Sequence, residues 1–111
     1  MPFVDFDQIE KIPITPQHSK AYGELVTGDS VEVGRLFFNA GDGAEPHSHP
    51  QEQIVIVLSG RAQIYLDGEE REVGPGQGFL APGGVAHRAV AIEDCVFLSC
   101  KNVEGGVGHA L

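Results

Sequence analysis

Two histidines separated by one residue, His47 and His49, are the residues of this 111-residue chain whose type and spacing most directly suggest chemistry. On a helix, side chains at i and i+2 leave from opposite sides, whereas on a strand they share one face about 6.6 Å apart. Both imidazoles can then direct one ring nitrogen at a single ion, with bonds of about 2.1 Å. The spacing therefore predicts a chelating pair in an extended segment.

Two further residues can complete such a site. Gln53 opens the next apolar run after a proline bend, so its side-chain carbonyl oxygen can return toward the histidine pair. His87 follows a tight turn at residues 82–84, which can carry it back across a barrel. We predict one divalent metal ion held by His47, His49, Gln53 and His87, with positions left open for water or substrate. Imidazole nitrogen and amide oxygen suit Mn, Fe, Zn, Ni and Cu, so the sequence does not fix the metal.

The elements that must position these side chains are strands, because the chain consists of short β-rich runs bounded by turn residues. The runs are 31–39, 53–59, 61–67, 70–73, 78–81, 85–91 and 95–101. Asp67-Gly68 predicts a type I′ hairpin turn between two of them. Residues 5–11 could form one helical turn, no segment sustains a helical period, and the glycine-rich tail from residue 104 is expected to be loosely attached. The sequence therefore predicts an all-β fold.

The run at residues 54–58, IVIVL, is apolar at every position. A strand with one solvent-exposed face would alternate apolar and polar residues. One face can line the barrel interior, but the other must meet the N-terminal segment, a second sheet or another subunit. We predict a homodimer.

Composition excludes several classes of partner. The length of 111 residues suits one domain, and the net charge of −9, without a basic stripe, disfavours nucleic acid and anionic membranes. The opening residues lack a signal-peptide pattern and no apolar run is long enough to span a membrane, so we expect a cytoplasmic protein that acts on a small molecule. Cys95 and Cys100, five apart in one strand, should be free thiols.

Two longer motifs carry a family resemblance. Gly41-x5-His47-x-His49-x3-Gln53-x6-Gly60 resembles cupin motif one, and Gly76-x5-Pro82-x-Gly84-x2-His87 resembles motif two, with Ala91 where asparagine often stands. The resemblance implies a double-stranded β-helix, the RmlC-like jelly-roll barrel, as a single domain over residues 1–111. An N-terminal arm would cover about 1–20, and the metal motifs would lie at 41–60 and 76–91.

Gln53 departs from that family pattern, which usually has glutamate at this position. Without an anionic ligand the site would keep the full +2 charge of the ion, which favours an anionic substrate such as a carboxylate or sugar acid. The same change should weaken the hold on the metal.

Within the cupins, the run from His47 to Gly60 most resembles the pectin-degradation, KdgF-like group of small single-domain cupins. That resemblance implies a three-histidine, one-glutamine metal site that helps to open unsaturated uronates. The group has an aspartate and an aromatic residue on its last strand, where the register here places Ser99 and Lys101, so those roles are not carried over. Candidates for the catalytic or substrate-binding residues are Lys101, Ser99 and Arg35, with Arg61 as a further cation.

We therefore predict isomerase- or lyase-like action on a small anionic substrate. Two alternatives stay open: an oxygen-activating cupin dioxygenase, and a non-catalytic domain in which the metal anchors a small ligand. Four residues, Phe37, Val55, Val57 and Phe79, could line an apolar pocket around the ion. His18 and His109 match no motif position and are expected to be solvated.

Overall fold

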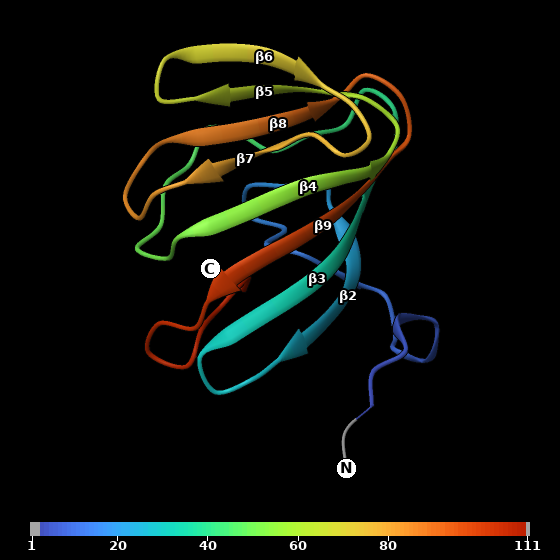
Figure 1. Ribbon diagram of the computed structural model, residues 1–111, viewed down its shortest axis with the longest axis vertical. Coiled ribbons are helices and arrows are strands. Elements are labelled where there is room, and N and C mark those ends of the chain that lie inside the picture. The colour runs from blue at the N-terminus through green and yellow to red at the C-terminus, as the bar shows by residue number, and fades with distance from the viewer. Residues whose placement is uncertain (1–2, 111) are drawn as a thin grey trace.

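The computed structural model describes residues 3–110 and is built almost entirely of strands (Figure 1). One 3₁₀ turn, η1 (Phe6–Gln8), precedes nine strands in the described part of the chain: β1 (Ile12–Pro13), β2 (Tyr22–Thr27), β3 (Val31–Phe38), β4 (Gln53–Ser59), β5 (Ala62–Leu66), β6 (Glu69–Val73), β7 (Gly78–Ala81), β8 (His87–Ala91) and β9 (Cys95–Asn102). The predicted all-β class is confirmed.

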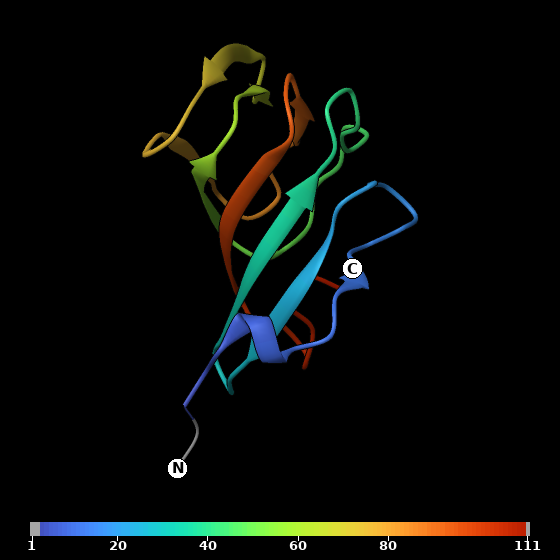
Figure 2. The same ribbon diagram turned by 90° about the vertical axis from the view of Figure 1, so that its right-hand side faces the viewer.

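The strands form two antiparallel sheets, in the orders β1-β2-β3-β9-β4-β7 and β6-β5-β8. Buried side chains from both sheets, such as Val55 and Phe97 from the larger and Ile64 from the smaller, belong to one core. The sheets therefore pack face to face as the two walls of a jelly-roll barrel, which Figure 1 and Figure 2 show from two directions.

Each predicted run corresponds to one of the strands from β3 to β9, with ends that differ by at most two residues. Asp67 and Gly68 have φ values of 48° and 82°, so the predicted hairpin turn has positive φ at both central positions. β2 was not predicted, because Gly23 and Glu24 interrupt its apolar pattern. Gly23 lies so close to β3 that an added Cβ would be 2.0 Å from the Arg35 carbonyl oxygen.

The barrel interior is apolar along most of its length and polar at one end. Along β9, Phe97 belongs to the core, whereas Ser99 and Lys101 on the same inward face belong to the polar end. Lys101 pairs across the sheet with Glu32 at the start of β3 and with Gln53 at the start of β4. The sheet register therefore gathers these three buried polar side chains at one place.

Arg35, a predicted candidate for substrate binding, does not face the barrel interior. β3 directs Glu32, Leu36 and Phe38 inward, so Arg35 lies on the outer face, where its guanidinium pairs with Glu24 and Asp7. Phe37 shares that outer face and stacks on Tyr22. The N-terminal segment carrying η1 crosses this surface (Figure 2), and its Lys11 pairs with Glu24, which is fully buried.

Cys95 and Cys100 are free, as predicted, with Cys95 buried and Cys100 half-buried on the other face of β9. Among the described residues, no helix has the length and hydrophobicity needed to cross a membrane.

Candidate metal centre

The three motif histidines lie together at the polar end of the barrel. His47 and His49 belong to an extended segment between β3 and β4 rather than to a long strand, and His47 forms an isolated antiparallel bridge with His87 at the start of β8. One ligand nitrogen from each histidine lies within 4.8 Å of those of the other two. The predicted convergence of residues 40 positions apart is therefore present.

Backbone carbonyl groups fix the tautomer of each ring. The Nδ1 atoms of His47, His49 and His87 lie 2.7, 3.0 and 2.9 Å from the carbonyl oxygens of Glu45, Gln51 and Val85, respectively. In each pair the oxygen can only accept, so Nδ1 must carry the proton and donate it. The lone pair is then on Nε2, the usual arrangement for a histidine that binds a metal.

Gln53 brings a fourth electron-pair donor to the same point. Its Oε1 lies 3.1 Å from Nε2 of His49 and 3.1 Å from Nε2 of His87. With the protons on Nδ1, all three atoms are acceptors and cannot hydrogen-bond to one another. Such a group is suited to a cation, and a spacing of 3.1 Å suits neighbouring ligands of an octahedral ion with bonds of about 2.1 Å.

The charge state of the ligands also suits a metal ion. Burial lowers the pKa values of His47 and His49, and it lowers that of His87 to about 4. The rings are therefore neutral at pH 7, and no proton has to be displaced from a ligand nitrogen when an ion binds. The four residues predicted as ligands fit a divalent metal in type, tautomer and spacing.

A pocket lined by His47, Gln53 and His87 has other walls that are mainly apolar, formed by residues such as Leu36, Val55 and Phe79. Val55 and Phe79 were predicted there, whereas Val57 is buried in the core and does not line the pocket. Lys101 contributes to the wall and is only 5% exposed.

Lys101 is the cation of the pocket. Among residues 3–110, no acceptor lies within hydrogen-bond distance of its ammonium and no carboxylate oxygen lies within 4.0 Å of it. Burial lowers its pKa to about 8, although the nearby carboxylate of Glu32 acts in the opposite direction. The positive charge of Lys101 in turn contributes to the lowered pKa of each ligand histidine. A buried, unpaired ammonium next to a metal site is suited to hold an anionic group of a bound molecule.

The other predicted candidates lie elsewhere. Ser99 faces inward as expected, but it is fully buried and does not line the pocket. Arg35 and Arg61 are both outside it, since Arg35 pairs with Glu24 and Arg61 pairs with Glu72.

Two histidines outside the motifs differ from one another. His18 is exposed, as predicted, and stacks on His47 with ring centroids 5.8 Å apart. The prediction of a solvated His109 is wrong, because that residue is 1% exposed and lines the pocket. The surrounding run of glycines is typical of a loose tail, and no local signal in the sequence indicates partners on distant strands.

Comparisons with known proteins agree with this architecture. The cupin domain family, Cupin_2, matches residues 34–100. An uncharacterized protein from Streptomyces coelicolor is 32% identical over 68 residues, which is 61% of this chain and 65%, slightly under two thirds, of that relative.

Among solved structures, KdgF from Halomonas sp. superposes with a TM-score of 0.81 and 26% identity over 92% of this chain and 93% of its own. The polyketide cyclase RemF from Streptomyces resistomycificus has a TM-score of 0.82 and 22% identity over 100% of this chain and 86% of its own, a likeness of fold. The chain therefore belongs to the cupin family, as its two histidine motifs indicate.

Proposed function

We propose that this cupin is a metal-dependent enzyme that acts on a small anionic substrate, a carboxylate or sugar acid, by isomerase- or lyase-like chemistry. The observation that carries the proposal is that Lys101, whose ammonium has no ion-pair partner among residues 3–110, lines the same pocket as His47, Gln53 and His87. The similarity to KdgF, at 26% identity over most of both chains, supports the same substrate class.

The four ligands would hold one divalent ion. When bound, that ion would supply Lewis acidity, polarising a carboxylate or carbonyl oxygen of the substrate. Because Gln53 is neutral, the site adds no negative charge of its own to oppose an anion.

The chain's own residues would bind and orient the substrate. Lys101 would donate charge-assisted hydrogen bonds to a carboxylate, which fixes the direction in which the molecule enters. With a pKa of about 8, its ammonium can also give up a proton near neutral pH, as a general acid requires. The apolar wall at Leu36, Val55 and Phe79 would exclude water from the rest of the molecule.

A non-catalytic binding domain is the second candidate, and one observation favours it. Among the described residues, no aspartate or glutamate lines the pocket, so a carboxylate acid–base group is missing there. Lys101 would then serve only to hold the ligand.

The test begins with the protein reloaded with Mn²⁺ or Zn²⁺ and screened on unsaturated uronates by loss of ultraviolet absorbance. Oxygen uptake with small acids is measured in parallel, because it detects a dioxygenase. Turnover that is lost in His49→Ala and kept in Ser48→Ala, an exposed neighbour on the same segment, would support the enzyme. Thermal stabilisation by these acids without turnover of any of them would contradict it and favour the binding domain.

A further inference from the structure

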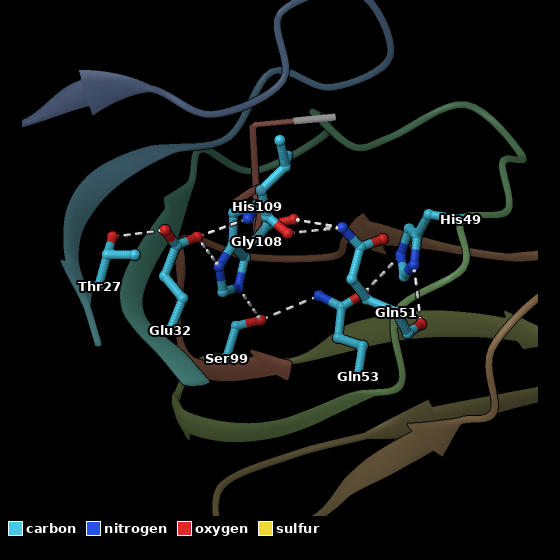
Figure 3. Close-up of polar contacts among 9 residues, drawn as sticks. Thr27, Glu32, His49, Gln51, Gln53, Ser99, Gly108 and His109 are labelled. Carbon is cyan, nitrogen blue, oxygen red and sulfur yellow. Dashed lines mark hydrogen bonds and ion pairs between the residues drawn. The ribbon is translucent and has the colours of Figure 1, made fainter. Parts of the chain in front are cut away.

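The C-terminal segment 103–110 folds back over the polar end of the barrel instead of remaining loose. The side-chain amide of Gln51 donates to the carbonyl oxygens of Val107 and Gly108, at 2.9 and 3.2 Å (Figure 3). Gly108 passes directly against Glu32, since an added Cβ would lie 2.6 Å from Glu32 Oε1. Only glycine allows this approach, which inserts the next residue, His109, into the barrel.

His109 joins a chain of hydrogen bonds that begins at a carboxylate and ends at a metal ligand (Figure 3). Its Nδ1 lies 2.6 Å from Oε1 of Glu32, and its Nε2 lies 2.8 Å from Oγ of Ser99. Ser99 Oγ in turn lies 2.9 Å from Nε2 of Gln53. The backbone N–H of His109 also donates to Glu32.

The donors and acceptors of this chain can be arranged in one direction. The Gln53 amide N–H donates to Ser99 Oγ, the Ser99 hydroxyl donates to His109 Nε2, and His109 Nδ1–H donates to Glu32. Burial raises the pKa of Glu32, but hydrogen bonds from Thr27 and His109 outweigh it and hold the pKa below its usual range. Glu32 is therefore an anion at neutral pH.

We propose that His109 is a positioning residue of the metal centre, which acts through Ser99 to orient and polarise the amide of Gln53. The chain fixes the amide with Nε2 toward Ser99, so Oε1 must face the histidine nitrogens. It also draws electron density toward Oε1, because each hydrogen bond in a chain strengthens the next. Where cupins usually have a glutamate ligand, this chain has the neutral Gln53. The carboxylate of Glu32 is connected to Gln53 by the hydrogen bonds through His109 and Ser99. This inference depends on the proposed metal site.

The order Glu32, His109 and Ser99 is also that of a nucleophilic triad, but the geometry opposes that role. Ser99 is 0% exposed, does not line the pocket, and has its oxygen engaged by both His109 and Gln53. A substrate carbonyl could not reach it, so the chain serves the amide and not an attack.

The test is a titration of the metal-free protein with Co²⁺ alone. Binding is measured by calorimetry and by the visible absorption of the bound ion. Partners of metal ligands typically contribute about 10- to 100-fold to metal affinity. We expect losses in this range for Ser99→Ala, His109→Ala and Glu32→Gln, with a changed Co²⁺ spectrum for Ser99→Ala. Glu32→Gln keeps the shape of the side chain and removes only its charge.

Thr27→Val is the matched control. It removes the hydrogen bond, 2.6 Å long, from Thr27 to the other carboxylate oxygen of Glu32 and leaves the chain intact. Its Co²⁺ affinity should stay within about twofold of the wild type. Unfolding of each variant in urea separates a change in affinity from a loss of fold.

A double-mutant cycle decides whether the chain transmits the effect. We expect Glu32→Gln to weaken Co²⁺ binding much less in the Ser99→Ala background, because the link is already broken. Additive effects would show that Glu32 acts through space and would overturn the inference, as would unchanged affinity in folded Ser99→Ala. Wild-type protein that binds no Co²⁺ would overturn the metal site as well, so the two failures are distinguishable.

Discussion

Replacing Lys101 by methionine should change the affinities for metal and for anionic ligand in opposite directions. The ammonium of Lys101 lies buried in the pocket and contributes to the lowered pKa of all three ligand histidines. It therefore disfavours positive charge at the ligand nitrogens, while it attracts a carboxylate. Methionine has a similar volume and removes only the charge.

The two magnitudes can be estimated separately. A charge-assisted hydrogen bond contributes about 1.5–3 kcal/mol, so a carboxylate should bind about 10- to 100-fold more weakly. Removing the ammonium also removes its repulsion of a +2 ion in the same pocket, so the metal should bind roughly tenfold more tightly, about 1.4 kcal/mol.

The assay is calorimetric titration of wild type and Lys101→Met, first with Co²⁺ and then, on the loaded protein, with glucuronate. It is run near pH 6.5, below the pKa of about 8, where Lys101 carries its proton. Lys20→Met, an exposed lysine, is the control and should change neither affinity. Weaker metal binding in Lys101→Met, or unchanged glucuronate binding, would contradict this role of Lys101.

Three further predictions follow from the same structure. The pKa of His87 is about 4 in the folded protein and 6.5 in the unfolded chain, so the unfolded chain takes up the proton first as the pH falls. The metal-free protein should therefore lose about 2 kcal/mol of unfolding free energy between pH 7 and pH 5 from His87 alone. Urea unfolding that shows no such loss would contradict this. Arg35→Met should destabilise the fold by about 2 kcal/mol, because it leaves the fully buried Glu24 without its main partner. The same variant should bind glucuronate as the wild type does, and an altered affinity would show that Arg35 binds substrate. If the predicted homodimer forms through the outer face of β4, where Ile54 and Leu58 are 40% and 48% exposed, replacing both by glutamate should give a monomer in sedimentation; a monomeric wild type would contradict it.

The clustering of the candidate metal-site residues could be predicted from the sequence because the pattern that marks each of them is local. His47 and His49 need only an extended segment, the turn before His87 is marked by a proline and two glycines at residues 82–84, and the start of β4 at Gln53 is marked by Pro50. Each ligand therefore carries its own signal. The pairing of His47 with His87 then follows from closing the barrel.

The orientation of β3 could not be predicted in the same way. Its two alternating faces are Val31, Val33, Arg35, Phe37 and Glu32, Gly34, Leu36, Phe38, and the first looks at least as suited to an interior. The interior at this end of the barrel is polar, however, so hydrophobicity gives the wrong face. Glu32 faces inward because His109 and Thr27 satisfy its carboxylate.

The role of His109 had no signal in its own neighbourhood. Its partner Glu32 lies 77 positions away in the sequence, and Ser99 lies on a different element. The glycines beside His109 allow a close approach to β3, yet in sequence they are typical of a flexible end. Only the folded chain shows that Gly108 is required by the position of Glu32.

The proposed metal site can be tested directly by the anomalous difference map of a crystal of the protein loaded with Co²⁺. We predict one strong peak, about 2.1 Å from Nε2 of His47, His49 and His87 and from Oε1 of Gln53. A map with no peak among these four atoms, or with the ion bound elsewhere, would contradict it.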